Sequence, residues 1–211
     1  MNKRRIRLNP YVLARVLPLI IGLGIVAAVC TIASLVGVVG SVVAGAVAAA
    51  SDRPLASFFT PQVLEWKPQI LRWSEAYGLD PNLTATVMQI ESCGNPRAVS
   101  RSGAQGLFQV MPNHFADGED MQDPETNARR GLEYLAESLL QSKGDVGRAL
   151  AGYNGGHGVI GLDPSQWSAE TQRYAYWGGG IFADASGGKA ASPRLGEWLA
   201  AGGSGLCRKA G

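Results

Sequence analysis

The chain has 211 residues, enough for one ordinary domain with appended segments. Its formal charge of +2 comes from the N-terminus, because residues 1–50 hold five basic and no acidic residues. Residues 51–211 therefore contain 14 basic and 17 acidic residues, a net charge of −3. The absence of a basic field over this part argues against nucleic acid as its main ligand.

An uncharged segment follows the basic N-terminus. From Val16 to Ser51 the chain holds no charged residue. This run exceeds the roughly 20 residues that cross a bilayer as a helix, and also the 7–15 apolar residues of a signal-peptide core. Because basic residues precede it, the N-terminus should stay in the cytoplasm and the rest should face outward. We therefore predict that residues 1–50 form a basic N-terminus and a single-pass membrane anchor, with the transmembrane helix at residues 17–39.

A long cleaved signal is the alternative to this anchor. Ala44-Gly45-Ala46 and Ala48-Ala49-Ala50 are small-residue sequences of the kind that a signal peptidase accepts. Cleavage would give a secreted or periplasmic protein, whereas the anchor would hold the domain on the outer side of the cell membrane. In both cases residues 51–211 are exported.

The exported part begins with a short linker at residues 51–60 and continues into helical patterns. Pro61 suits the first position of a helix and Gly78 suits its C-terminal end. Asp80-Pro81 opens a second helix by the same logic, and this helix ends at Glu91. The apolar residues of both helices recur at spacings of three and four, as one buried face requires: Val63, Trp66, Ile70, Trp73 and Tyr77, then Leu83, Val87 and Ile90.

The next hundred residues also favour helices. The stretch from Gly94 to Gly106 is rich in turn-forming residues and is expected to be largely loop. Helices are predicted from Pro124 to about Gln141 and from about Asp145 to Tyr153. No alternating strand pattern occurs, so we predict a mainly α-helical domain at residues 61–178.

After residue 178 the pattern weakens. Glycine pairs and a glycine triplet interrupt short apolar pieces, of which only Pro193 to Ala201 suggests a further turn or two of helix. We therefore describe residues 179–211 as a Gly-rich C-terminal tail.

Glu91 occupies an unusual place on its predicted helix. At helical spacing it lies about 40° around the axis from Val87 and about 60° from Met88, so it borders the apolar face. A carboxyl group in that place is partly desolvated, which raises its pKa towards the range useful for general acid catalysis. An exposed glutamate at the end of a helix is the plainer alternative, and the helix alone does not exclude it.

Several short motifs follow Glu91 in a fixed order. They are Glu91-Ser92, the stretch from Gly103 to Pro112, the stretch from Ala149 to Gly156, and Glu170-Thr171 with Tyr174. Taken together they resemble the catalytic domain of the soluble lytic transglycosylases, over roughly residues 65–178. The resemblance implies a lysozyme-like fold with a cleft for a sugar chain.

The resemblance also implies a reaction and its catalytic group. Family members cleave the β-1,4 bond between N-acetylmuramic acid (MurNAc) and N-acetylglucosamine (GlcNAc) in peptidoglycan, and form 1,6-anhydro-MurNAc without water. Their single catalytic carboxylate corresponds to Glu91, which would act first as an acid and then as a base. The sequence shows no obvious second carboxylate in the nearby motifs, which suits this mechanism better than a two-carboxylate hydrolysis.

Other positions match family residues around the sugar. The resemblance implies that Glu91 is assisted by seven substrate-binding residues: Ser100, Gln109, Met111, Tyr153, Asn154, Glu170 and Tyr174. For each of them a purely structural role is the alternative. Where this chain has Phe108 the family commonly has Met, so we expect one sugar subsite to be reshaped.

Two exported cysteines invite a disulfide. Cys93 and Cys207 would persist as a disulfide in an oxidising compartment, and the bond would tie the tail to the loop after Glu91. Two free thiols are the alternative. His114 and His157 are too few and too scattered for a metal site, so we predict no metal and no cofactor.

Two further functions compete with a lytic transglycosylase. A goose-type lysozyme would cleave the same glycan by hydrolysis, and a non-catalytic glycan-binding module could serve an envelope machine. All three readings have peptidoglycan glycan strands as the partner, and none involves nucleic acid. Endo or exo cleavage is left open by the sequence.

Overall fold

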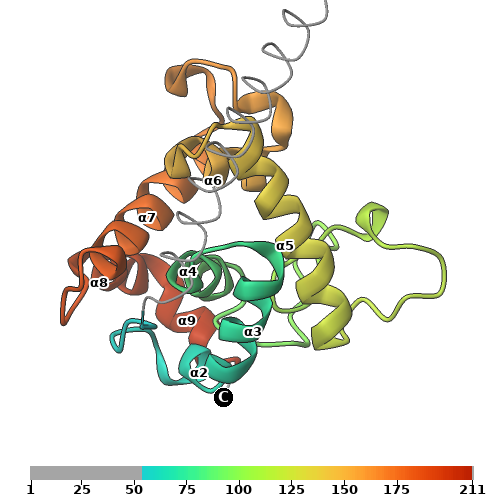
Figure 1. Cartoon of the computed structure of the whole chain (residues 1–211), viewed down its shortest axis with the longest axis horizontal. Coiled ribbons are helices and arrows are strands. Elements are labelled where there is room, and N and C mark those ends of the chain that lie inside the picture. The colour runs from blue at the N-terminus through green and yellow to red at the C-terminus, as the bar shows by residue number, and fades with distance from the viewer. Residues whose placement is uncertain (1–53, 211) are drawn as a thin grey trace, which may run out of the picture. The chain divides into compact units, whose positions relative to one another are not determined.

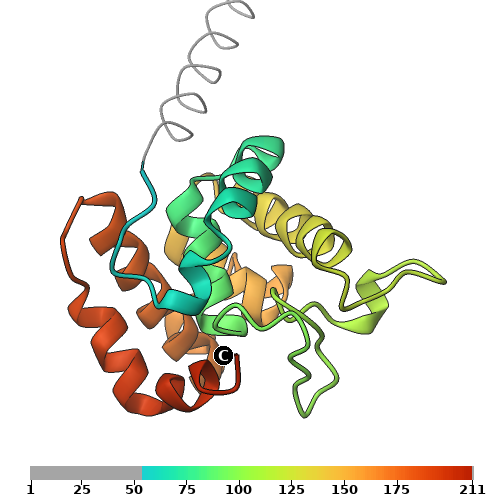
Figure 2. The ribbon, with the colours of Figure 1, turned by 90° about the horizontal axis from the view of Figure 1, so that it is seen from below.

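The computed structural model describes residues 54–210 (Figures 1 and 2). These residues are mainly helical, as predicted, and their only β-type pairings are the isolated bridges Val99–Gln105 and Gln105–Val110. The predicted transmembrane helix at residues 17–39 and the predicted cleavage sequences lie outside the described residues. Between residues 54 and 210, no helix has the length and apolar character that crossing a membrane requires.

The first predicted helix is divided in two. Helix α2 spans Pro61–Leu64 and α3 spans Lys67–Tyr77. Pro68 causes the break, because its ring has no N–H to donate and would clash with the carbonyl group of Leu64, four residues earlier. As predicted, α3 ends at Gly78, which takes a left-handed conformation with φ of 62°.

Helix α4 (Pro81–Glu91) lies at the centre of the described residues, with contacts to α2, α3 and α7 (Figure 1). Its residues from Pro81 to Gln89 are all buried. The Asp80 side chain caps the helix by accepting a hydrogen bond from the backbone N–H of Asn82. This burial on every side explains why Glu91 reaches the interior of the domain.

Helix α5 (Pro124–Gln141) has the bounds that the sequence predicted and is capped by Asp123. It holds the loop that follows α4 in place. Asn127 of α5 accepts a hydrogen bond from the backbone N–H of Phe108 at 2.9 Å and donates one to the carbonyl oxygen of Gln105 at 2.8 Å. A side chain on Gly106 would collide with Asn127, so the glycine is required for this close approach.

Helices α6 (Val146–Gly155) and α7 (Ala169–Ser186) pack against each other and α5 packs against α6. The predicted domain end at residue 178 falls inside α7, which continues through all three glycines of the Gly178–Gly180 triplet. Gly178 is buried against Leu150, where a Cβ atom would lie only 2.9 Å from a side-chain carbon. The glycines therefore allow close helix packing here and do not end the helix. Three short 3-10 turns complete this part: η1 (Pro112–His114), η2 (His157–Val159) and η3 (Pro164–Gln166).

The C-terminal residues fold onto the domain. Helix α8 (Pro193–Trp198), the π-helical turn η4 (Leu199–Gly203) and α9 (Ser204–Cys207) follow α7, and α8 packs against α7. Leu195, Trp198 and Cys207 are buried in the same core as α4. The residues expected to form a tail are thus a structured part of the domain, from α7 to Ala210.

Candidate active site

Glu91 stands at the point where α4 ends. The helix stops because Cys93 and Gly94 adopt positive φ angles of 54° and 82°. The hydroxyl of the buried Ser92 donates a hydrogen bond to the carbonyl oxygen of Leu107 at 2.7 Å, which ties the end of α4 to the following loop. Glu91 is therefore held on a rigid helix end beside a loop that is itself anchored.

The carboxyl group of Glu91 has one hydrogen-bond partner. The hydroxyl of Tyr174, from α7, donates to its Oε1 atom at 2.7 Å. Burial is the main cause that raises the pKa of Glu91 to about 8; the hydrogen bond from Tyr174 lowers this pKa, and the nearby charge of Glu170 contributes to raising it. At neutral pH the group is therefore mainly protonated.

Glu91 opens into a pocket of about 370 Å³. We call it the Glu91 pocket. Its walls come from α4, α6, α7 and α8, and it contains a second carboxylate, Glu170, which is exposed. The lining residues are Ile90, Glu91, Asn154, Glu170, Arg173, Tyr174, Trp177 and Trp198.

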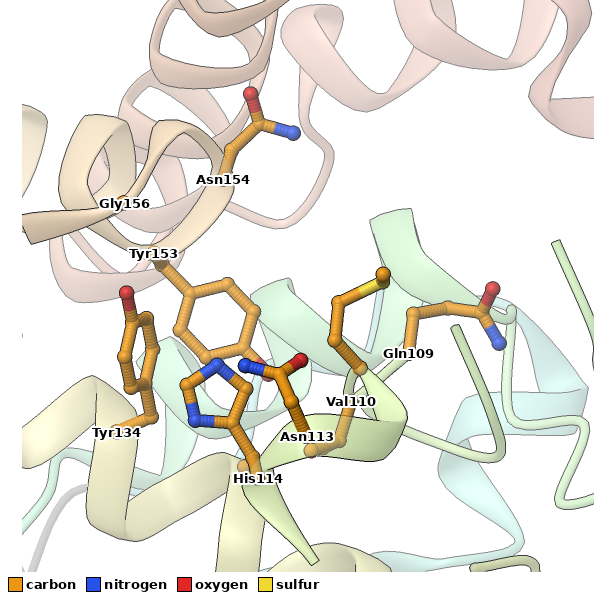
Figure 3. A pocket seen from close by; sticks show the side chains of 10 residues that line it. Gln109, Val110, Asn113, His114, Tyr134, Tyr153, Asn154 and Gly156 are labelled. Carbon is orange, nitrogen blue, oxygen red and sulfur yellow. The ribbon is translucent and has the colours of Figure 1, made fainter. Parts of the chain in front are cut away.

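A second pocket, of about 230 Å³, shares Asn154 with the first. We call it the aromatic pocket. The rings of Tyr134, Tyr153 and His114 gather at one end, and Gln109 lies at the other (Figure 3). Because Asn154 lines both pockets, they adjoin at this residue.

Stacked tyrosines connect the two pockets. Tyr153 and Tyr174 have ring centroids 6.4 Å apart, at an interplanar angle of 19°. The hydroxyl of Tyr153 donates to the carbonyl oxygen of Phe108 at 2.8 Å. Burial and the proximity of Glu91 raise the pKa of both tyrosines well above the usual value. Tyr174 therefore stays protonated and remains a donor to Glu91.

The predicted site residues divide between these pockets. Gln109, Met111 and Tyr153 line the aromatic pocket, Glu170 and Tyr174 line the Glu91 pocket, and Asn154 lines both. Ser100 lines neither of them. Its hydroxyl accepts a hydrogen bond from the backbone N–H of Ala104 at 3.0 Å, which is a structural role within a turn.

Two other expectations change with the structure. Gln109 lines a pocket, but its amide also donates to the carbonyl oxygens of Ala98 and Gly106, so it supports the loop as well. Phe108 is fully buried, with its ring against that of Trp73 and its centroid 6.1 Å away. Because Phe108 has no exposed surface, it does not itself line a sugar subsite, and any reshaping must act through the residues packed around it.

Among the pocket-lining residues that sequence reasoning missed, six have polar or aromatic side chains. The aromatic pocket also includes Asn113, His114 and Tyr134, and the Glu91 pocket includes Arg173, Trp177 and Trp198. Arg173 and Trp177 lie three and seven residues after Glu170 on α7, a helical spacing that could have indicated them. Trp198 carried no such signal, because it reaches the pocket from the C-terminal residues.

Cys93 and Cys207 form a disulfide in the structure, with their Cα atoms 5.0 Å apart. The side-chain amide of Gln89 donates to Cys93 Sγ at 3.1 Å, and the hydroxyl of Thr60 lies 3.2 Å from the same sulfur. The bond lies two residues after Glu91 and ties α9 to the end of α4. Between residues 54 and 210, no group of three His, Cys, Asp or Glu residues could hold a metal ion.

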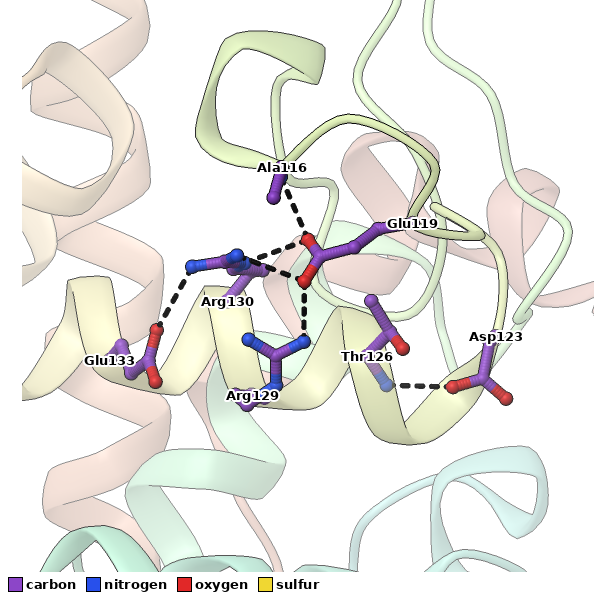
Figure 4. A network of polar contacts seen from close by, with 7 residues as sticks. All are labelled: Ala116, Glu119, Asp123, Thr126, Arg129, Arg130 and Glu133. Carbon is purple, nitrogen blue, oxygen red and sulfur yellow. Dashed lines mark hydrogen bonds and ion pairs between the residues drawn. The ribbon is translucent and has the colours of Figure 1, made fainter.

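The acidic loop of Asp117, Glu119 and Asp120 stays away from both pockets. Glu119 is more than a solvated turn residue, because Arg129, Arg130 and the backbone N–H of Ala116 all donate to its carboxylate (Figure 4). These donors, with the Arg130 hydrogen bond as the largest cause, lower the pKa of Glu119 to about 2. The loop is thus fastened to α5 by charge and offers no partner to Glu91.

Comparisons with known proteins point to one family. The model for the "Transglycosylase SLT domain" matches residues 68–175, just over half of the chain. A transglycosylase of Enterobacteria phage PRD1 is 40% identical over 113 residues, which cover 53% of this chain and 40% of that protein. Residues 68–175, which the family model matches, contain Glu91 and the six predicted residues that line the pockets.

Two bacterial relatives have similar names. An endo-type membrane-bound lytic murein transglycosylase A of Klebsiella pneumoniae is 33% identical over 96 residues, 38% of this chain and 45% of that protein. A membrane-bound lytic murein transglycosylase C of Photorhabdus laumondii is 38% identical over 120 residues, 46% of this chain and 32% of that protein. In each case the chain spans less than half the length of the relative.

Proposed function

Because the chain belongs to the transglycosylase SLT domain family, as its four ordered motifs predicted, we propose that it is a peptidoglycan lytic transglycosylase. The substrate is the glycan strand, and the bond that breaks is the β-1,4 bond from MurNAc to GlcNAc. The relatives named as lytic murein transglycosylases support this activity. The observation that carries the proposal is the protonated, enclosed carboxyl group of Glu91 in its pocket.

Glu91 acts first as the acid. With a pKa raised to about 8, its carboxyl group holds a proton at neutral pH and donates it to the oxygen of the leaving GlcNAc. The hydrogen bond from Tyr174 occupies Oε1, which leaves Oε2 to face the substrate. Tyr174 thereby orients the carboxyl group and stabilises the carboxylate that forms after proton transfer.

Glu91 then acts as the base. The N-acetyl group of the substrate stabilises the cationic centre at C1 of MurNAc. The new carboxylate accepts the proton of the C6 hydroxyl while that oxygen attacks C1, which gives 1,6-anhydro-MurNAc and restores the acid. No water is consumed, and the proton taken from the C6 hydroxyl group balances the proton given to the leaving group.

Hydrolysis of the same bond remains a second candidate because of Glu170. Its exposed carboxylate lies in the Glu91 pocket, where it could activate a water molecule as in an inverting glycosidase. Glu170 belongs to the last of the four motifs, for which the resemblance implied sugar binding, so its use as a base is a separate hypothesis. It is also the reason why a goose-type lysozyme activity must be tested directly.

Mass spectrometry of the released muropeptides distinguishes these activities. We expect purified peptidoglycan treated with the protein to release anhydro-muropeptides, which are lighter by one water than the hydrolytic products. Reducing-end products would establish a hydrolase instead. A protein that binds peptidoglycan and releases neither product would be the non-catalytic glycan-binding module.

We further propose that the protein works at the outer side of the cell membrane, anchored by residues 17–39, and that envelope machinery is a further partner. The names of the membrane-bound relatives support this location. Fractionation of cells that express the full chain or a form lacking residues 17–39 tests it. We expect the first in the membrane fraction, and a cleaved N-terminus in the secreted fraction would contradict the anchor.

A further inference from the structure

The Glu91 pocket extends beyond the part of the chain that the family model matches. That match ends at residue 175, whereas α8 contributes Trp198 to the wall of the pocket. Trp198 is the last residue of α8 and has 5% of its surface exposed. The C-terminal residues therefore contribute to the wall of the Glu91 pocket as well as to the core.

The indole ring of Trp198 is held tightly. Gly203 packs directly on it, since a Cβ atom there would lie 2.4 Å from a ring carbon. The disulfide of Cys207 fastens the following residues to the end of α4, and Asn95 donates a hydrogen bond to the carbonyl oxygen of Lys209 at 3.1 Å. Trp198 is thus positioned relative to Glu91 through a covalent link that starts two residues after Glu91.

The indole N–H of Trp198 has no acceptor among the residues that the structure describes. The indoles of Trp66, Trp73 and Trp167 donate to Gly94, Glu125 and Val159, respectively. In residues 54–210 the buried side-chain polar atoms without a partner are Gln69 Oε1 and Ser186 Oγ, so the Trp198 nitrogen is in contact with open space. A largely buried tryptophan normally satisfies this donor, and here the ring borders the pocket of the proposed catalytic acid.

We propose that Trp198 is a substrate-binding residue whose indole N–H donates a hydrogen bond to an oxygen acceptor of the glycan, an acetamido carbonyl or a hydroxyl group. This inference rests on the proposed function. Trp177, on α7, adds a second aromatic side chain to the same wall. The sugar bound beside Glu91 would then contact residues that lie outside residues 68–175, the range that the family model matches.

A pair of tryptophan substitutions tests the inference. Trp198→Phe keeps an aromatic ring in the core and removes the N–H donor of a residue that lines the Glu91 pocket. Trp167→Phe is the matched control, because Trp167 is similarly buried and lines neither pocket. Its indole N–H donates a hydrogen bond to the carbonyl oxygen of Val159 at 2.9 Å. Steady-state kinetics on soluble uncrosslinked glycan strands, thermal unfolding, and calorimetric titration with tetra-N-acetylchitotetraose are measured for the full chain and for both variants.

The two substitutions should differ in KM. Loss of one donor to a neutral acceptor should raise KM and the Kd for the oligosaccharide by roughly five-fold in Trp198→Phe, and its unfolding midpoint should also fall because the smaller ring leaves space beside Gly203. Trp167→Phe loses an internal hydrogen bond, so its midpoint should fall while its KM stays unchanged.

Three outcomes would overturn the inference: unchanged KM and Kd in Trp198→Phe, an equal rise of KM in the Trp167→Phe control, or a rise in KM that follows only from a lower unfolding midpoint. A wild-type protein that releases no muropeptide would refute the proposed function instead. In that case the titration with the oligosaccharide still decides whether Trp198 binds a glycan.

Discussion

Two glutamates in this domain have opposite environments. Glu91, at the end of α4, has a pKa raised to about 8, whereas Glu119, in the loop before α5, has a pKa lowered to about 2. Glu91 receives one hydrogen bond, from a neutral tyrosine, and shares its pocket with a second carboxylate. Glu119 receives hydrogen bonds from two guanidinium groups and a backbone N–H.

The difference shows that the partners of a carboxylate decide its protonation. Burial without a cation favours the neutral acid, which is the form that can give a proton to a leaving group. Charged donors favour the anion, which ties a loop to a helix and has no proton to give. The two side chains thus differ in protonation, although the sequence shows the same residue type in both places.

The largest expected effect comes from replacing Glu91. Glu91→Gln keeps the shape of the side chain and the hydrogen bond from Tyr174 but removes the proton donor. We expect the rate of anhydro-muropeptide release to fall by about 1,000-fold or more, as for other lost acid–base groups. The loss of turbidity of purified sacculi measures this rate, and product mass identifies the muropeptides that are released.

Glu119→Gln is the control for that experiment. It removes the carboxylate that holds Arg129 and Arg130 but touches neither pocket. Its rate should stay close to that of the wild type. A Glu91→Gln variant that retains activity would contradict the assignment of the catalytic acid, and an inactive Glu119→Gln variant would show that the two regions are not independent.

The next effect concerns the disulfide beside Glu91. Cys207→Ser opens a loop closed over 114 residues of sequence, which should lower the free energy of unfolding by about 4 kcal/mol. Release of α8 and α9 should also admit water to the pocket, so the pKa of Glu91 should move down towards that of an ordinary glutamate. Denaturant unfolding and the pH dependence of kcat/KM measure these changes.

Cys30→Ser is the control variant. It replaces the third cysteine of the chain, which is not part of the Cys93–Cys207 disulfide. Ellman titration of the denatured, unreduced protein must also show that Cys93 and Cys207 are blocked. Two reactive thiols at these positions would remove the basis of the prediction.

The sequence predicts those parts of the molecule in which local signals agree with packing. Asp123-Pro124 caps a helix that ends at Gln141 as expected, and the position of Glu91 beside an apolar face already indicated a raised pKa. The break between α2 and α3 was also encoded, by Pro68, but the continuous apolar spacing concealed it. In these regions the residues that determine the local structure are close to one another in the sequence.

The remainder depends on residues that are distant in sequence. The Gly178–Gly180 triplet resembles a helix end, yet buried contact with Leu150 makes it part of α7. Trp198 reaches the Glu91 pocket across more than 100 residues through the disulfide, and Glu119 meets Arg129 and Arg130 from another element. No periodicity or local motif records such pairings.

The pH dependence of stability should differ in sign between the two glutamates. For Glu91 the folded pKa lies above the unfolded value of about 4.5, so the folded state binds more protons and stability falls as pH rises from about 4.5 to 8. For Glu119 the folded pKa is lower, so its contribution is present above about 4.5 and is lost as pH falls towards 2.

Thermal unfolding at several pH values tests this difference in sign. Glu91→Gln should remove the decline between pH 4.5 and 8, and Glu119→Gln should weaken the decline in acid. If Glu91→Gln left the curve unchanged between pH 4.5 and 8, the carboxyl group would not be buried and neutral in the folded protein.

The smallest effects come from the two neighbours that adjust Glu91. Tyr174 lowers the pKa of Glu91 through its hydrogen bond, whereas the charge of Glu170 raises it. Tyr174→Phe should therefore move the alkaline fall of kcat/KM to higher pH, and Glu170→Gln should move it to lower pH. Because kcat/KM reports the free enzyme, a loss of sugar binding in either variant changes the height of the profile and not its position.

These opposite shifts also bear on the reaction type. If Glu170 only tunes Glu91, Glu170→Gln shifts the profile and still yields the anhydro product. If Glu170 activates water, the same substitution removes the reducing-end product and the fall of kcat/KM at low pH that protonation of Glu170 would cause. A shift in the same direction for both variants would mean that their effect is structural. The position of the profile and the mass of the product, measured on one set of variants, thus separate an acid that works alone from a pair of carboxylates.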